Sequence, residues 1–125
     1  MTAGAASEVL AANRAFYAAF NLRDLTAMAE LWSDSDDVTC IHPGWDVLGG
    51  RTLVLESYAA IFGNPAQGKV VAGGESVALA GDGAVVVCHE LVGGAPLVAT
   101  NVFRKEGGAW KVVLPQAGQV VARFG

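Results

Sequence analysis

The sequence predicts an α+β fold in which helices from the first half of the chain pack on a curved antiparallel sheet formed by the second half. Apolar residues recur at helical spacing up to residue 62, and from residue 69 onward the pattern is that of strands separated by glycine-containing turns. Helices followed by antiparallel strands are typical of the α+β class, with the helices on one face of the sheet. Such a sheet curls, and helices on one side leave a cone-shaped cavity that suits a small molecule.

Three helices are expected before the sheet. The first runs from Ser7, its N-cap, to about Asn21, after a loose end over Met1–Ala6. Asp24 is expected to cap a second, short helix. The apolar stripe of that helix is Leu25, Met28, Ala29 and Trp32.

The third helix is predicted over Arg51–Phe62, with Gly63 as its C-cap and Pro65 preventing its continuation. Between the second and third helices lie two features. Ser33–Asp37 is expected to be a solvated polar loop, because its aspartates lack the spacing of a calcium loop. Val38–Arg51 is expected to form a hairpin.

The hairpin turns at Pro43-Gly44, because proline presets φ for a turn and glycine relieves the steric cost of the next position. His42, Trp45 and Asp46 flank this turn, which makes it the first place to look for a site. Asp46 is expected to cap the turn, with orientation of His42 as the alternative.

Four long strands follow, with glycine-rich turns between them. Their predicted ranges are Val70–Leu79, Ala84–Val92, Leu97–Lys105 and Ala109–Pro115. The tail over Gln116–Gly125 is ambiguous, and Val120-Val121 can extend the last strand.

The chain of 125 residues is long enough for one substantial core, so a single domain over residues 1–125 is expected. Although 53% of the residues are hydrophobic, no apolar run reaches the roughly eighteen residues of a membrane span. The net charge is −4 and Lys and Arg are scattered, which argues against a nucleic-acid partner. The first seven residues lack the basic start and apolar core of a secretory signal, so the cytoplasm is the expected compartment.

The segments at the helix junction, the hairpin and the last two strands together resemble one known superfamily. These segments are Phe20–Leu25, Cys40–Trp45 with Gly50-Arg51, Ala99–Arg104 and Trp110–Val113. They resemble the nuclear transport factor two-like superfamily, in particular its SnoaL-like and ketosteroid-isomerase-like branch. The resemblance implies a cone-shaped, cystatin-like fold, a pocket between the helices and the sheet, and dimers formed through the sheet.

The resemblance also implies where catalytic groups would lie. Ketosteroid isomerases use a tyrosine on the first helix, an aspartate base before the hairpin proline and a protonated aspartate on the penultimate long strand. By motif these positions match Phe16, His42 and Asn101, and all three differ in type. Phe16 cannot donate a hydrogen bond, although its neighbour Tyr17 can if the register is shifted by one. Many SnoaL-like relatives also have a histidine-rich stretch where this chain has Val113–Gly118 with no histidine. A close copy of ketosteroid isomerase is therefore not expected.

The candidate catalytic residues are His42, Asn101 and Tyr17. His42 has the side chain best suited to acid–base work near neutral pH, and its alternative role is to hold the hairpin through a backbone carbonyl. Asn101 is expected to face the helices with Ala99 and Phe103, where its amide is either an oxyanion donor or a structural bridge. Aromatic residues at helical and strand spacing are expected to form the core and the pocket wall. The predicted wall residues are Phe16, Phe20, Trp32, Trp45, Tyr58, Phe62 and Phe103.

Other polar residues carry less weight. His89 and Glu90 are adjacent on a strand, so one faces each side of the sheet, and the outward position is favoured for Glu90. A His42–His89 metal pair lacks a third ligand, so no metal or other cofactor is expected. Cys40 and Cys88 lie in apolar runs and are expected to be reduced core thiols.

The sequence therefore predicts a pocket that binds a small, largely apolar organic molecule. As an enzyme, the chain would perform cofactor-free acid–base chemistry such as isomerisation, dehydration or cyclisation, with His42 as base and Asn101 or Tyr17 as donor. The alternative is a binding or dimerising module without catalysis. The outer sheet face carries Val98 and Val102, and an apolar face without helices predicts a homodimer.

Overall fold

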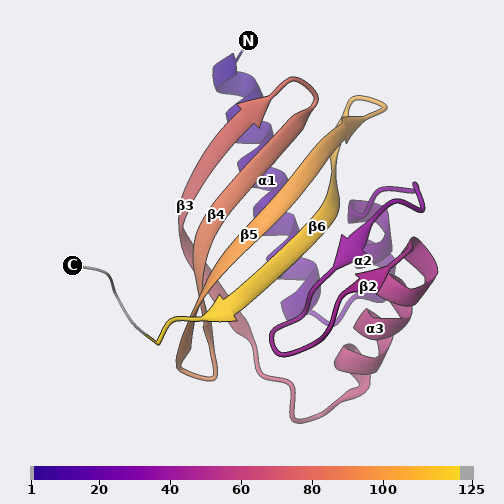
Figure 1. The fold of residues 1–125 in the computed structure, drawn as a ribbon, viewed down its shortest axis with the longest axis vertical. Helices are drawn as coiled ribbons and strands as arrows, with labels where there is room; N and C mark the ends of the chain where they lie inside the picture. Colours follow the sequence, from indigo (N-terminus) through magenta and orange to yellow (C-terminus); the bar gives the residue numbers. More distant parts are fainter. Residues whose placement is uncertain (1, 122–125) are drawn as a thin grey trace.

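Helices cover one face of an antiparallel sheet in the computed structural model, which describes residues 2–121 (Figure 1). The helices are α1 (Thr2–Asn21), α2 (Leu25–Leu31) and α3 (Arg51–Gly63). The strands are β1 (Thr39–Cys40), β2 (Leu48–Gly49), β3 (Val70–Ala80), β4 (Gly83–Val92), β5 (Ala95–Glu106) and β6 (Ala109–Gln119). The long strands pair in the order β3-β4-β5-β6, and this arrangement confirms the predicted α+β class.

The helix ends differ from the prediction in two places. Helix α1 begins at Thr2 rather than Ser7, because the alanines before Ser7 favour helix and only Gly4 disfavours it. Gly63 is the last residue of α3 rather than a left-handed cap, and Asn64 ends the helix with φ −85°. The cap of α2 is confirmed, since Asp24 Oδ1 accepts a hydrogen bond from Ala27 N at 3.0 Å.

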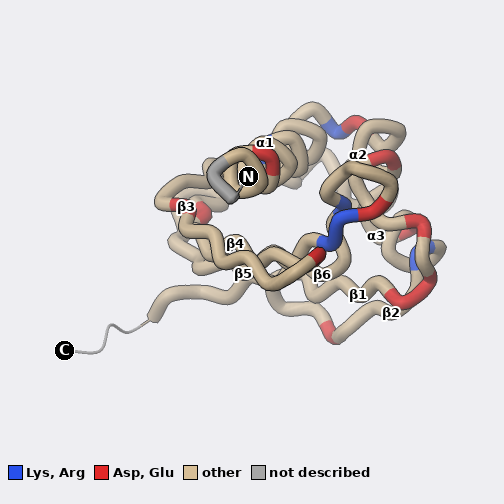
Figure 2. Tube along the Cα trace, turned by 90° about the horizontal axis from the view of Figure 1, so that it is seen from above, with Lys and Arg blue, Asp and Glu red and all other residues tan. Residues whose placement is uncertain are grey.

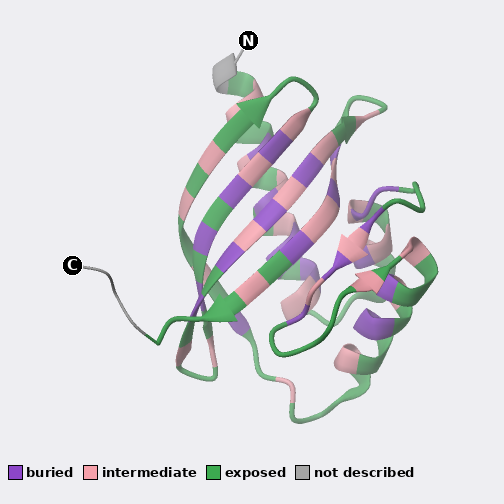
Figure 3. Cartoon of the chain, viewed as in Figure 1, coloured by how far each residue is buried: buried purple, intermediate pink, exposed green. Residues whose placement is uncertain are grey.

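The sheet presents one buried and one exposed face. Along β5 the buried residues alternate with more exposed ones, a pattern visible as stripes in Figure 3. Ala99, Asn101 and Phe103 are buried toward the helices, as predicted. Strand β6 is longer than predicted and ends at Gln119, short of Val120-Val121. Residues 122–125 of the predicted tail lie outside the described part of the chain.

The β1–β2 hairpin is confirmed, with its turn at Pro43-Gly44. Gly44 has φ 82°, and Trp45 N donates to His42 O at 2.9 Å across the turn. Ile41 N donates to Pro115 O at 3.1 Å, so the hairpin lies beside β6. Seen from above, the helices and this hairpin enclose one side of the sheet (Figure 2). His42 is thereby carried to the inner side of β6.

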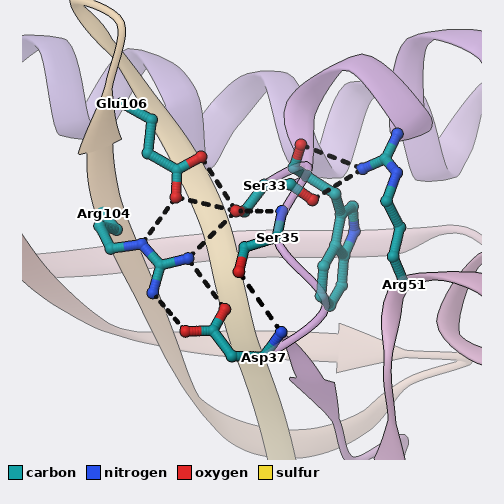
Figure 4. A network of polar contacts seen from close by, with 7 residues as sticks. Ser33, Ser35, Asp37, Arg51, Arg104 and Glu106 are labelled. Atoms are coloured by element: carbon teal, nitrogen blue, oxygen red, sulfur yellow. Dashed lines mark hydrogen bonds and ion pairs between the residues drawn. The ribbon is translucent and has the colours of Figure 1, made fainter.

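The segment Ser33–Asp37 is exposed from Asp34 to Asp37, as predicted for a solvated polar loop, but its side chains also contact β5 (Figure 4). Arg104 on β5 donates to both carboxylate oxygens of Asp37, at 2.9 and 3.0 Å, and to Glu106 at 2.6 Å. Ser33 is fully buried and its hydroxyl donates to Glu106. The Arg104 guanidinium lowers the pKa of Asp37 to about 2. These contacts join the segment to the end of β5.

Arg51 at the start of α3 fixes the end of α2. Its guanidinium donates to the carbonyl oxygens of Trp32 and Ser33 at 3.2 and 2.8 Å (Figure 4). It also donates to the carbonyl oxygen of Ala29 at 2.8 Å. Carbonyls at a helix end have no partner within the helix, so a side-chain donor replaces the missing bonds.

No helix among residues 2–121 combines the length and the apolar character needed to cross a membrane.

Candidate functional site

A cavity of about 340 Å³ lies between α1, α3, the β1–β2 hairpin and the inner face of the sheet. Its aromatic lining is Phe16, Tyr17, Phe20, Trp45 and Tyr58. Its polar lining is His42, Asn64, Gln67, Glu90, Asn101 and Gln116. No lysine or arginine of the described residues lines this cavity.

The aromatic wall follows from helical spacing. Phe16 and Phe20 lie one turn apart on α1, and each ring meets the ring of Tyr58 from α3 edge to face, at 6.3 and 6.4 Å between centroids. The ring of His42 also meets Tyr58, at 5.0 Å. Tyr58 therefore joins the helix side of the cavity to the hairpin side.

Three predicted wall residues are placed elsewhere. Trp32 and Phe103 are fully buried in the core, and Phe62 packs against Phe20, none of them lining the cavity. The prediction was wrong for these three because periodicity shows only which side of an element faces inward. Trp45 lines the cavity at its rim and keeps 47% of its surface exposed.

Glu90 faces the cavity, which corrects the outward orientation favoured from the sequence. It is 8% exposed, and Tyr17 donates its hydroxyl hydrogen to Glu90 Oε2 at 2.5 Å. Asn101 Nδ2 donates to the same Tyr17 oxygen at 3.0 Å. His89 is consequently exposed on the outer face. Two of the three predicted catalytic residues, Asn101 and Tyr17, are thus hydrogen-bonded to each other, and Tyr17 joins them to a carboxylate for which the outward position was favoured.

The hydrogen bonds of Tyr17 and Asn101 extend away from the cavity to residues that were not predicted from the sequence. Asn101 Nδ2 also donates to Asn13 Oδ1 at 2.9 Å, and Asn13 Nδ2 donates to Glu75 Oε2 at 3.0 Å. Arg14 forms an ion pair with Glu75 at 3.0 Å. Asn13 is one turn before Tyr17 on α1, so the spacing was sufficient to predict its position on the inner face. Nothing in the local sequence marks Glu75.

His42 is held by Ser57, another residue that was not predicted from the sequence. Ser57 lies one position before Tyr58, and its hydroxyl donates to Val54 O at 2.6 Å. That bond uses its only hydrogen, so the contact of 2.8 Å between Ser57 Oγ and His42 Nε2 requires an Nε2–H donor. The neutral ring then carries its lone pair on Nδ1. The Cys40 sulfur lies 3.7 Å from Nδ1.

Burial shifts the ionisation of these groups in opposite directions. Desolvation lowers the pKa of His42 to about 4, so the imidazole is neutral at pH 7. Desolvation raises the pKa of Glu90, and the Tyr17 hydrogen bond opposes part of that rise. Burial also raises the pKa of Tyr17 well above its usual range and that of Cys40 to about 11. Both cysteines are free and buried, as predicted.

Two alternatives from the sequence analysis are not supported by the contacts. Asp46 is exposed and its carboxylate accepts from Val47 N, so it belongs to the turn and does not orient His42. Among residues 2–121 no group of three or more His, Cys, Asp or Glu side chains is arranged to hold a metal ion.

The profile of the SnoaL-like domain matches residues 9–118, which include the whole cavity. The chain belongs to the SnoaL-like family. Solved structures with the same arrangement of elements are described as NTF2-like proteins and as cystatin-like folds, which confirms the superfamily and the fold predicted from the sequence.

Three proteins similar to this chain carry names that describe different roles. A candidate dehydratase of the NTF2-like family from Streptomyces avermitilis is 36% identical, with a TM-score of 0.87 over 98% of this chain and 100% of that one. A candidate calcium/calmodulin-dependent protein kinase type II association domain from Thiobacillus denitrificans is 32% identical, with a TM-score of 0.80 over 88% of this chain and 93% of that one. The F-box protein SKIP8 of Arabidopsis thaliana is 31% identical over 108 residues, or 84% of this SnoaL-like chain. The chain spans 46% of that F-box protein.

The buried imidazole gives a prediction for acid stability. The pKa of His42 is about 4 in the folded state and 6.5 in the unfolded state. The stabilisation that neutral His42 gives to the folded state is therefore complete above about pH 6.5 and is lost as the pH falls toward 4. We expect this residue alone to remove about 3 kcal/mol of unfolding free energy between pH 7 and pH 4. Urea denaturation at several pH values measures the slope. His42→Gln should remove this part of the slope, and His89→Gln, at an exposed position, should keep it; an unchanged slope in His42→Gln contradicts the prediction.

Proposed function

We propose that this SnoaL-like chain binds a small, uncharged and largely apolar organic molecule in the cavity and catalyses cofactor-free acid–base chemistry on it, of the dehydratase type. The observation that carries the proposal is the presence of His42 and Glu90 on the wall of one cavity lined by aromatic and aliphatic side chains, with burial shifting their pKa values in opposite directions. Titratable groups whose environments shift them apart are typical of acid–base sites.

The lining favours a neutral ligand with a carbonyl or hydroxyl oxygen. Aromatic and aliphatic side chains supply the apolar surface, and amide groups from Asn64, Gln67 and Gln116 supply neutral hydrogen-bonding partners. A carboxylate or phosphate would lie near Glu90 without any cation of the described lining to balance it. The ligand class is therefore uncharged.

In the proposed reaction His42 acts as the base and Glu90 acts as the acid. His42, neutral at pH 7 with its lone pair on Nδ1, removes a proton from the carbon beside a ligand carbonyl. The electron pair of that C–H bond forms a carbon–carbon double bond as the neighbouring C–O bond breaks. The hydroxyl leaves as water with a proton from Glu90, and burial raises the pKa of this carboxyl, which favours its protonated form. The resemblance to the Streptomyces candidate dehydratase supports this reaction type.

A ligand-binding module without turnover is the second candidate. Its support is that His42 is already engaged by Ser57 and packed between aromatic rings of Trp45 and Tyr58. The two candidates share the cavity and differ only in whether His42 and Glu90 move protons. Turnover therefore separates them.

We also propose a homodimer formed through the outer sheet face. Four apolar side chains on that face are 38% to 65% exposed, and no helix of residues 2–121 covers them. They are Val71, Val87, Leu91 and Val98. Apolar side chains gathered on one exposed face are typical of an association surface.

A reducing compartment such as the cytoplasm fits the free thiols of Cys40 and Cys88.

Ligand binding should depend on charge. We expect 2-naphthol to raise the melting temperature by about 5 °C at ten times its dissociation constant, because a molecule that binds only the folded state stabilises it by mass action. The matched anion 2-naphthoate should give no shift. Ala117→Phe, which fills the cavity wall, should abolish the shift, and Ala59→Phe on the exposed side of α3 should retain it. A larger shift with the anion would overturn the proposed ligand class.

Turnover should require both titratable groups. Aryl β-hydroxy ketones are suitable probes, because their dehydration to conjugated enones is followed by ultraviolet absorbance. We expect His42→Gln and Glu90→Gln each to lower the rate by about 100-fold or more while thermal unfolding stays cooperative. His89→Gln, on the outer face, should leave the rate unchanged. Binding of the ketones without turnover in the unaltered protein would favour the module without catalysis.

The dimer should dissociate when the outer face is charged. We expect sedimentation of a dimer at micromolar concentration and of a monomer after Val98→Lys, because a buried unpaired ammonium is costly. Val47→Lys, on the exposed hairpin, should remain dimeric. A monomer of the unaltered chain at this concentration would contradict the proposal.

A further inference from the structure

A continuous line of side-chain hydrogen bonds runs from the surface to the cavity wall. From the surface inward it joins Arg14, Glu75, Asn13, Asn101, Tyr17 and Glu90. Helix α1 supplies three of these residues and lies across the inner face of β3, β4 and β5, which supply one each (Figure 1). Asn13 and Asn101, in the middle, are 0% and 2% exposed. The proposed proton transfers do not use Arg14, Glu75 or Asn13.

The outer half of the line fixes the orientation of two amides. A carboxylate only accepts hydrogen bonds, so Asn13 must turn its NH₂ group toward Glu75, where the Nδ2–Oε2 distance is 3.0 Å. The Asn13 oxygen then points inward and can only accept. Asn101 must therefore turn its NH₂ group toward it, at 2.9 Å.

The inner half of the line fixes the hydroxyl hydrogen of Tyr17. The NH₂ group of Asn101 donates its second hydrogen to the Tyr17 oxygen at 3.0 Å. With that lone pair occupied, the hydroxyl hydrogen is directed at Glu90 Oε2, at 2.5 Å, in preference to the weak acceptor sulfur of Cys88 at 3.4 Å. Both amide hydrogens of Asn101, one amide hydrogen of Asn13 and the hydroxyl hydrogen of Tyr17 are thus each assigned to one acceptor.

We propose that Asn13 and Glu75 are positioning residues that lock this arrangement, so that a proton held by Glu90, which lines the cavity, sits on Oε1, the oxygen that no side chain of the line engages. Oε2 is already occupied as an acceptor, and Oε1 accepts no hydrogen bond from any residue in the described range 2–121. A proton on Oε1 is placed where a ligand can take it. The inference rests on the proposed function only in naming Glu90 as the acid.

The surroundings of Glu90 allow its titration to be followed. The titratable groups closest to it are Tyr17 on α1, Cys88 on the same strand and Tyr58 on α3. Burial raises the pKa of each of these three, so they stay neutral while Glu90 titrates. Glu75 lies farther along the line, and His42 lines the same cavity.

The first test is Asn13→Leu in the ligand-free protein, which removes the amide without changing the net charge. Asn101 then loses the partner that fixes its orientation, and in the flipped amide its oxygen accepts the Tyr17 hydrogen. Glu90 loses a donor to its carboxylate, so its pKa should rise by about half a unit or more, measured from the ¹³C resonance of the carboxyl carbon. The side-chain NH₂ resonances of Asn101 should double or broaden.

A second variant keeps the arrangement while moving the negative charge. In the double variant Asn13→Asp with Glu75→Gln, the carboxylate introduced on α1 still only accepts from Asn101. The amide introduced on β3 donates to that carboxylate, and the net charge is that of the unaltered protein. The Asn101 resonances should return to one sharp pair.

In Glu75→Gln alone, the new amide can either donate to or accept from Asn13. The side-chain NH₂ resonances of Asn101 should therefore double or broaden as in Asn13→Leu, without a change in the cavity wall.

Val9→Ala, one turn before Asn13 on the core side of α1, is the matched control for lost stability and should leave both readouts unchanged. Unchanged Asn101 resonances in Glu75→Gln, or an unchanged Glu90 titration in a folded Asn13→Leu, would overturn the positioning role. These measurements need no ligand, so they fail or succeed independently of the binding and turnover experiments. A normal line of hydrogen bonds in a protein that binds nothing would overturn the proposed function alone.

Discussion

The hydrogen bond of 2.9 Å between Asn101 and Asn13 is the interaction on which the rest of the interior depends. Each of these amides is buried between α1 and the sheet, where an unpaired polar group costs a few kcal/mol, of the order of 1–3. Pairing them therefore sets the position of α1 over β5. In that position Tyr17, one turn further along, meets Glu90, while Phe16 and Phe20 face α3.

The same enclosure that holds the helix also sets the chemistry of the wall. Withdrawal from water disfavours the charged form of any group, and it lowers the pKa of a base while raising that of an acid. Burial therefore favours the neutral form of both His42 and Glu90, which line one cavity. Two ionisable groups whose charged forms are disfavoured thus share a wall with the rings of Phe16, Phe20 and Tyr58.

Periodicity and turn residues were sufficient to predict the fold, including the inward orientation of Asn101 and the turn beside His42. They were not sufficient for the site. The outward position was favoured for Glu90 and the inward one was left open, because its partner Tyr17 is 73 residues away in the sequence and strand alternation alone does not show which face is inside. Trp32 and Phe103 show a related limit of sequence patterns. Their spacing correctly predicts that they are buried, but only the packed structure distinguishes side chains that contact a neighbouring element from those that line a cavity.

The cavity wall is divided between two kinds of structure. Glu90, Asn101 and Tyr17 belong to strands and a helix, whereas much of the rim comes from connections, with Trp45 after the hairpin turn and Gln67 before β3. Substitutions, insertions and changes of length are tolerated in connections far more readily than in packed elements. Related chains can therefore change the residues of the entrance while keeping the buried groups on the strands and the helix. A varied entrance built over one unchanged set of buried polar groups is the evolutionary outcome that this division permits.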